Sequence, residues 1–166
     1  MPEYDSNRRE FVKVSTAGIG GLVFSSFTGA SKEHPLPLTA ESPADKKLKI
    51  ICVGAHPGDP EFGCGGTLAR YADAGHLVSV LYLTRGEAGD PDKTYEQSAA
   101  LRTHEAETAC SLLKIKPLFF GQTDANTVLN KISIDDMTKR IQAEKPDLLF
   151  THWPLDATLD HQVAGL

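Results

Sequence analysis

The chain has too few cysteines, at the wrong spacing, for a disulfide framework or a cysteine-based zinc site. Three cysteines occur among 166 residues, and no two form a C-x-x-C pair. Cys52 lies in an apolar run, Cys64 in a glycine-rich turn and Cys110 in a segment with helical periodicity. We expect no disulfide framework, and we expect Cys64 to be a small packing residue.

The chain also lacks a positive charge surplus and a long apolar segment. Lys and Arg number 17 against 22 Asp and Glu, a net charge of −5 that argues against a nucleic-acid partner. The apolar run at residues 14–27 is too short to span a bilayer, so we expect no membrane span in the mature form. With 40% hydrophobic residues, the chain can form one domain with a real core.

The first residues resemble a twin-arginine export signal. Arg8 and Arg9 precede a large apolar residue, a lysine and the short apolar run, and Thr28-Gly29-Ala30 offers small residues for cleavage. We therefore expect a signal peptide at residues 1–30 and an exported, periplasmic or extracytoplasmic protein. A linker rich in proline, serine and alanine follows at residues 31–47, and the folded domain occupies residues 48–166.

Strand-like and helix-like patterns then alternate four times, which indicates an α/β fold with a parallel sheet and right-handed crossovers. In the usual doubly wound order the first and fourth strands are neighbours. The expected strands are residues 48–55, 76–84, 116–121 and 147–152; the expected helices are residues 66–74 and 98–113, and one with Ser133 as its N-cap that runs to about residue 144.

Histidines and aspartates are concentrated after the first and fourth expected strands, in HPGDPE and HWPLDATLDHQ. The carboxyl ends of these strands flank one crevice, so His56 and Asp59 should meet residues of the second stretch there. Two ligands from the first stretch and one from the second would leave an open position, as in catalytic zinc sites. A histidine at a strand end, such as His152, is more often a hydrogen-bonded structural residue. The second-stretch candidates are His152, Asp156, Asp160 and His161.

A nucleotide-binding domain is the weaker alternative. Gly63, Gly65 and Gly66 resemble a phosphate-binding turn, but the G-x-G-x-x-G spacing is not met. The second expected strand ends in Thr84-Arg85, with no acidic residue to bind a ribose.

From residue 48 to residue 166 the chain resembles the PIG-L/LmbE family of zinc-dependent N-acetylglucosamine deacetylases. The resemblance implies a Rossmann-like three-layer sandwich with a mostly parallel sheet. Family members normally continue beyond this point, so we expect the N-terminal part of such a domain. The family motifs A-H-P-D-D, T-x-G-E-x-G, R-x-x-E-A and H-x-D-H correspond to residues 55–59, 84–89, 102–106 and 158–161.

The resemblance also implies an activity and the residues that carry it. The protein would be a metal-dependent hydrolase that removes acetyl from an N-acetylated sugar or glycoconjugate of the N-acetylglucosamine type. His56, Asp59 and His161 would bind Zn²⁺ or another divalent metal, and Asp160 would orient its neighbours. Arg85 and Glu87 would lie in the loop that borders the sugar.

Two positions depart from the family pattern. Gly58 stands where the family has its general base, and Thr158 where it has the histidine that supports the oxyanion. Asp156, Glu61 or Glu87 could supply a catalytic carboxylate instead. The alternative is a carbohydrate- or metal-binding domain that kept the metal ligands and lost the base.

The export prediction can be tested directly. Replacing Arg8 and Arg9 together by Lys should leave the precursor in the cytoplasm, because the arginine pair is the recognised feature of this signal. Cell fractionation measures the outcome. Normal accumulation of the double variant outside the cytoplasm would contradict the twin-arginine interpretation.

Overall fold

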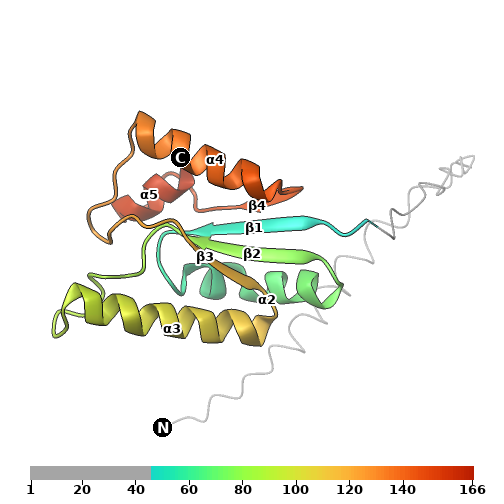
Figure 1. Cartoon of the computed structure of the whole chain (residues 1–166), viewed down its shortest axis with the longest axis horizontal. Helices are drawn as coiled ribbons and strands as arrows, with labels where there is room; N and C mark the ends of the chain where they lie inside the picture. Colours follow the sequence, from blue (N-terminus) through green and yellow to red (C-terminus); the bar gives the residue numbers. More distant parts are fainter. Residues whose placement is uncertain (1–45) are drawn as a thin grey trace, which may run out of the picture. The chain divides into compact units, whose positions relative to one another are not determined.

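The computed structural model describes residues 46–166, which form a four-stranded, fully parallel sheet (Figure 1). The strand order is β3-β2-β1-β4, so the expected α/β fold and the pairing of the first and fourth strands are confirmed. The expected signal peptide and nearly all of the linker lie outside the described residues. The strands are β1 (Lys49–Gly54), β2 (Leu77–Tyr82), β3 (Lys116–Phe119) and β4 (Leu148–Phe150).

Helices cover both faces of the sheet and complete a three-layer sandwich (Figure 1). On one face, α2 (Asp59–Asp73) and α3 (Tyr95–Leu113) pack on the β1 side chains Ile50 and Cys52. On the other face, α4 (Lys131–Glu144) and α5 (Leu159–Gly165) contribute Met137 and Ala164 beside Ile51 and Val53. Because both faces are covered, β1 is buried along nearly its whole length, as is usual in parallel sheets. No helix among residues 46–166 is long and apolar enough to cross a membrane.

Helix α2 begins at Asp59, inside the HPGDPE stretch, and the expected start at Gly66 is wrong. Pro60 lies in the first turn, where its missing N–H costs nothing, and the Glu61 carboxylate accepts a hydrogen bond from the Gly58 amide (3.1 Å). The helix is kinked at Cys64, whose φ of −148° and ψ of 16° are not helical. The loop expected to carry the metal ligands is therefore partly the first turn of a helix.

The other two long helices also begin earlier than expected, because other residues cap them. Asn130 is the N-cap of α4: its side chain accepts from the Ser133 amide (3.0 Å), and the Ser133 hydroxyl accepts from the Asn130 amide (2.9 Å). Ser133 is thus the partner of the cap and not the cap itself. Thr94 and Gln97 form the same reciprocal arrangement at the start of α3. The strands are each shorter than expected by a few terminal residues.

The packing of the core predicts that two leucines, on the helices that cover one face of the sheet, differ in their contribution to the free energy of unfolding. Leu68 on α2 is completely buried, whereas Leu112 on α3 is 79% exposed. Leu68→Ala should lower the free energy of unfolding by about 2–5 kcal/mol, because it leaves a cavity. The matched Leu112→Ala change should stay within about 0.5 kcal/mol. Urea denaturation of both variants measures this, and equal losses would contradict the packing described.

Candidate metal centre and active site

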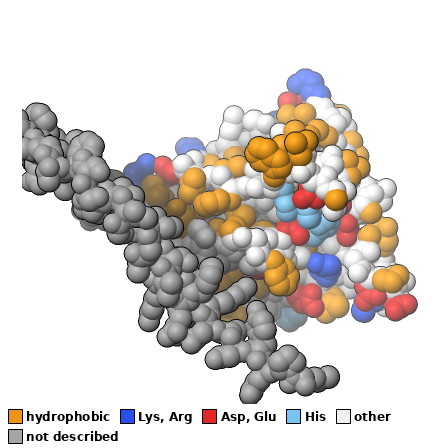
Figure 2. Space-filling view, turned by 180° about the vertical axis from the view of Figure 1, so that it is seen from behind, with side chains coloured by type: hydrophobic (Ala, Val, Ile, Leu, Met, Phe, Trp, Pro, Cys, Tyr) orange, Lys and Arg blue, Asp and Glu red, His pale blue; other side chains and the backbone are white. Residues whose placement is uncertain are grey.

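The candidate site lies where β1 and β4 end and α2 and α5 begin. His56 follows β1, His152 follows β4, and Asp160 and His161 lie in the first turn of α5. Figure 2 shows histidine and carboxylate side chains gathered on one face of the domain, with apolar side chains around them. The two stretches singled out in the sequence therefore meet, as expected from the strand order.

Three imidazoles converge on a single carboxylate oxygen, Asp59 Oδ2. It lies 3.3 Å from His56 Nδ1, 3.4 Å from His152 Nε2 and 3.4 Å from His161 Nε2. The ligand atoms of His56, Asp59 and His161 all lie within 4.8 Å of one another. Two imidazole nitrogens and one carboxylate oxygen at this separation suit a divalent cation such as zinc. The residues present therefore fit the metal that the sequence leads us to expect.

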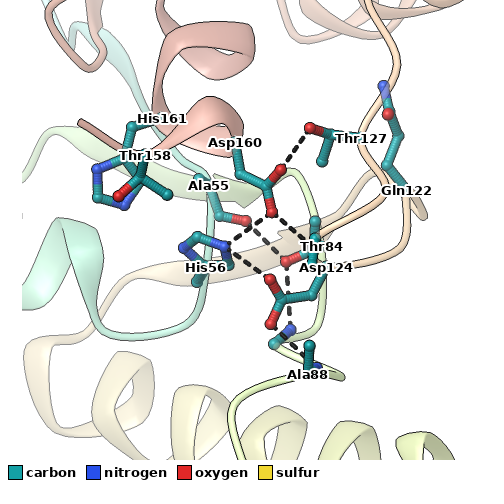
Figure 3. A network of polar contacts seen from close by, with 12 residues as sticks. Ala55, His56, Thr84, Ala88, Gln122, Asp124, Thr127, Thr158, Asp160 and His161 are labelled. Carbon is teal, nitrogen blue, oxygen red and sulfur yellow. Dashed lines mark hydrogen bonds and ion pairs between the residues drawn. The ribbon is translucent and has the colours of Figure 1, made fainter. Parts of the chain in front are cut away.

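Two carboxylates hold the opposite nitrogen of His56. Its Nε2 lies 3.0 Å from Asp124 Oδ1 and 3.1 Å from Asp160 Oδ2 (Figure 3). Asp160 is only 3% exposed and also accepts hydrogen bonds from the Thr127 hydroxyl (2.5 Å) and the Ala125 amide (2.8 Å). These contacts keep a proton on Nε2 and leave Nδ1 directed at Asp59, the arrangement that second partners impose on metal-binding histidines.

The carboxylates on both sides of the His56 ring favour its charged form when no cation is bound. Burial opposes that charge, but the hydrogen bonds to Asp59 and Asp160 outweigh it and raise the pKa of His56 to about 9. Burial likewise opposes the charge of Asp59, yet its contacts with His56 lower its pKa. Binding of a cation between these groups would release the proton on Nδ1, so metal uptake is coupled to proton loss.

His161 is oriented from two sides. Its Nδ1 lies 3.2 Å from Asp156 Oδ1, and its ring stacks on His152 with centroids 4.1 Å apart and planes 18° apart. His152 Nε2 also accepts a hydrogen bond from the Ala55 amide (3.2 Å), which joins the ends of β4 and β1. Asp156 and His152 thereby direct His161 Nε2 toward Asp59.

The two residues expected beside the sugar form an ion pair, with Arg85 Nε 3.5 Å from Glu87 Oε1, but differ in exposure. Glu87 is 7% exposed, and its Oε2 accepts hydrogen bonds from the backbone amides of Arg85 and Asp124, each at 3.1 Å. Glu87 therefore connects the loop after β2 to the loop after β3 and positions Asp124. The side chain of Arg85 is half exposed and can contact a ligand.

Arg102, the arginine of the R-x-x-E-A motif, supports the same loops. Its Nη2 donates to the Pro57 carbonyl (2.6 Å), and Gly86 and Gly89 lie directly against its guanidinium. A Cβ at Gly86 would lie 2.6 Å from Arg102 Nε, and one at Gly89 would lie 2.5 Å from Nη1. The glycines of one motif thus make room for the arginine of another.

Sequence reasoning did not single out Asp124 and Thr127 as site residues. Both follow β3, whose carboxyl end lies at the same edge of the sheet as those of β1 and β4. The available signal was the run of polar residues after a third parallel strand. Asp124 contacts His56 directly, and Thr127 contacts Asp160 (Figure 3).

Gly58, at the position of the family's base, has a backbone conformation that few other residues adopt. Its φ is 102° and its ψ is −32°, and a Cβ there would lie 3.4 Å from the Phe62 ring. An aspartate at this position would be strained unless the loop changed shape. Glycine here is therefore part of how the loop enters α2.

Comparisons with known proteins agree with this geometry. Residues 51–166 match the family model PIG-L, described as GlcNAc-PI de-N-acetylase. A 1D-myo-inositol 2-acetamido-2-deoxy-alpha-D-glucopyranoside deacetylase of Kineococcus radiotolerans is 39% identical over 123 residues, covering 69% of this chain and 34% of that protein. The diacetylchitobiose deacetylase of Thermococcus kodakarensis is 29% identical over 138 residues, covering 78% and 51%. The chain thus spans between a third and about half of these relatives' lengths.

A solved structure has the same fold. The N,N'-diacetylchitobiose deacetylase of Pyrococcus horikoshii, complexed with its inhibitor MPG, superimposes with a TM-score of 0.69. The match covers 99% of this chain and 58% of that one, at 23% identity. At that identity the comparison establishes the architecture.

The convergence on Asp59 predicts which histidines determine metal affinity. His56→Ala should weaken Zn²⁺ binding by more than the roughly 10- to 100-fold that loss of a supporting partner costs, because it removes a ligand. His104→Ala, at an exposed position on α3, should leave the affinity unchanged. Isothermal titration of the metal-stripped proteins measures both. Equal affinities of the two variants would rule out His56 as a ligand.

Proposed function

Because the chain belongs to the PIG-L family, we propose that its protein is a zinc-dependent hydrolase that removes the acetyl group from an N-acetylated sugar. The observation that carries the proposal is the convergence of His56 and His161 on the Asp59 carboxylate. These three residues would hold the ion. Bound zinc lowers the pKa of a water molecule and polarises an amide carbonyl.

The chain's own residues then have distinct tasks. Asp124 and Asp160 keep a proton on His56 Nε2, so that Nδ1 remains directed at Asp59. Asp156 orients His161 through Nδ1 in the same way. Arg85 is half exposed and pairs with Glu87 through Nε, so its other guanidinium nitrogens would bind a sugar hydroxyl or a carbonyl oxygen.

Among the three carboxylates considered as general base, we favour Asp156, because one of its carboxylate oxygens is not already used by the described residues. Both oxygens of Glu61 are engaged, one by the Gly58 amide and the other by the Tyr82 hydroxyl. Glu87 is buried and holds backbone amides. Within residues 46–166 the hydrogen bonds of the Asp156 carboxylate use Oδ1 alone, so Oδ2 would take a proton from the attacking water. The same oxygen would return that proton to the departing amine nitrogen.

The substrate class follows from what two relatives have in common. One acts on a 2-acetamido-2-deoxy-glucopyranoside of inositol, and another on diacetylchitobiose, as their names state. We propose that this protein also takes a small N-acetylglucosamine-type sugar or glycoconjugate. Trp153 and Leu155, 72% and 82% exposed on the loop that carries Asp156, offer apolar surface for a sugar ring or its aglycone.

Export remains part of the proposal. The supporting observation is the Arg8-Arg9 pair before a short apolar run, which lies outside the described residues. An exported deacetylase would meet its sugar outside the cytoplasm.

A binding domain without catalytic activity is the second candidate. Gly58 and Thr158 favour it, because glycine cannot take the proton that the family's base accepts, and threonine can support an oxyanion only through a neutral hydrogen bond. Such a domain would bind the metal and the sugar and release no amine.

The test is release of free amine from N-acetylglucosamine compounds by the whole protein. Activity should disappear on chelation and return with Zn²⁺. Asp156→Asn should lower kcat by about 10²- to 10⁴-fold, because the amide loses the basic oxygen. Its Oδ1 can still accept from His161, so Zn²⁺ affinity should change little.

Asp136→Asn, an exposed change on α4, is the matched control and should keep full activity. Metal binding with no amine release in the wild type would favour the binding domain. Full activity of Asp156→Asn would remove Asp156 from the mechanism and leave the deacetylase proposal intact.

A further inference from the structure

Two of the three cysteines form a contacting pair that the metal chemistry does not use. Cys52 Sγ on β1 and Cys64 Sγ on α2 lie 3.5 Å apart, and both thiols are free. Cys110 lies elsewhere in the same core, with its sulfur 3.4 Å from the Tyr82 hydroxyl. The sequence led us to expect Cys64 to be a packing residue only, because the spacing of the cysteines does not reveal this contact.

We propose that Cys52 and Cys64 form a reversible disulfide that joins β1 to α2 beside the candidate metal centre. The two sulfurs must approach to about 2.05 Å. The backbone at Cys64 can absorb that movement, since α2 is already non-helical there. The preceding residue, Gly63, is exposed, and a Cβ there would meet no atom of the described residues within 4 Å, so the side of the helix at Gly63 is open.

A small oxidant can reach one thiol of the pair. Both cysteines line a cavity of about 200 Å³, but Cys64 is only half-buried, whereas Cys52 is 4% exposed. Burial, and then the neighbouring Cys64 sulfur, raise the pKa of the Cys52 thiol far above its ordinary value. Cys64 is therefore the first nucleophile, and Cys52 is the thiol that closes the bond.

The exchange balances with a low-molecular-weight disulfide as oxidant. The Cys64 thiolate attacks one sulfur of that disulfide, breaks its S–S bond and releases one thiol. The Cys52 sulfur then attacks the Cys64 sulfur of the mixed disulfide and expels the second small thiol, which takes up the Cys52 proton. Two protein thiols are oxidised to one disulfide, and one small disulfide is reduced to two thiols.

The bond would act on the part of the helix that carries a proposed ligand. Asp59 opens α2, and Asp59 and His152 line the same cavity as the two cysteines. Oxidation would therefore tie α2 to β1 at Cys64, just after the first turn that begins with Asp59, and restrict the movement of that turn. This inference does not depend on the deacetylase proposal, because it requires neither metal nor substrate.

The experiment equilibrates the whole protein with excess oxidised glutathione, blocks free thiols by alkylation after unfolding, and analyses tryptic peptides by mass spectrometry. Residues 50–70 contain both Cys52 and Cys64 and no internal Lys or Arg, so trypsin releases them as one peptide. The disulfide lowers the mass of this peptide by two hydrogens relative to its reduced, unalkylated form. The peptide of residues 103–114, which carries Cys110, should be alkylated. Reduction by excess reduced glutathione should reverse the change.

Two variants provide the controls. Cys110→Ala should oxidise as the wild type does, and Cys64→Ser should not form the bond. Oxidised wild type should melt roughly 5–15 °C above its reduced form, with no such difference for Cys64→Ser. Amide hydrogen exchange in the first turn of α2 should slow in the oxidised wild type alone.

Three results would overturn the inference. The first is free, alkylated Cys52 and Cys64 after equilibration. The second is glutathione retained on Cys64 with no intramolecular bond, and the third is a disulfide that involves Cys110 or a second copy of the chain.

Discussion

The site depends on one constraint: a half-buried carboxylate oxygen, Asp59 Oδ2, must face three imidazoles at once. Burial penalises the charge on such an oxygen, and a protonated histidine or a metal ion beside it offsets that penalty. The fold satisfies this by placing β1 next to β4, which brings His56 and His161 together from segments about a hundred residues apart. Asp59 itself is fixed locally, because Oδ2 also accepts a 2.7 Å hydrogen bond from the His56 amide.

The set of metal-site candidates was predictable because it needs only short-range spacing and strand order. His56 and Asp59 are three residues apart after a strand, and a doubly wound sheet specifies where the other ligands come from. Asp124 and Thr127 were not predictable in the same way, since an irregular loop has no periodicity that would show which side chain points at His56. The start of α2 was missed because glycine and proline indicate a turn, although proline fits the first turn of a helix equally well.

The position of the general base shows where the conformation of a loop overrides a motif. By sequence alone, Gly58 is only the loss of the family's carboxylate at this position. Its φ of 102° shows in addition that the backbone at the start of α2 has a conformation that mainly glycine adopts. Glu61 is the next carboxylate in the sequence after the proposed ligand Asp59, but both of its oxygens already accept hydrogen bonds, one from the Gly58 amide and one from the Tyr82 hydroxyl. The proposal therefore assigns proton transfer to the β4–α5 loop, where Asp156 is the carboxylate that also touches a proposed ligand.

Arg102 and the two glycines against it have an evolutionary consequence. Because a Cβ at Gly89 would lie 2.5 Å from the guanidinium, a larger residue at 89 requires Arg102 to move or to be replaced by a shorter residue. Two stretches that look like separate signatures are therefore a single steric unit, and a harmful change in one can be suppressed by a second change in the other. Gly86 has a φ of 69°, which strains any residue with a side chain. A shorter residue at position 102 would remove the steric clash with a Cβ at position 86 but would not remove this backbone strain. Positions 89 and 102 should thus change together over evolutionary time, while position 86 stays glycine.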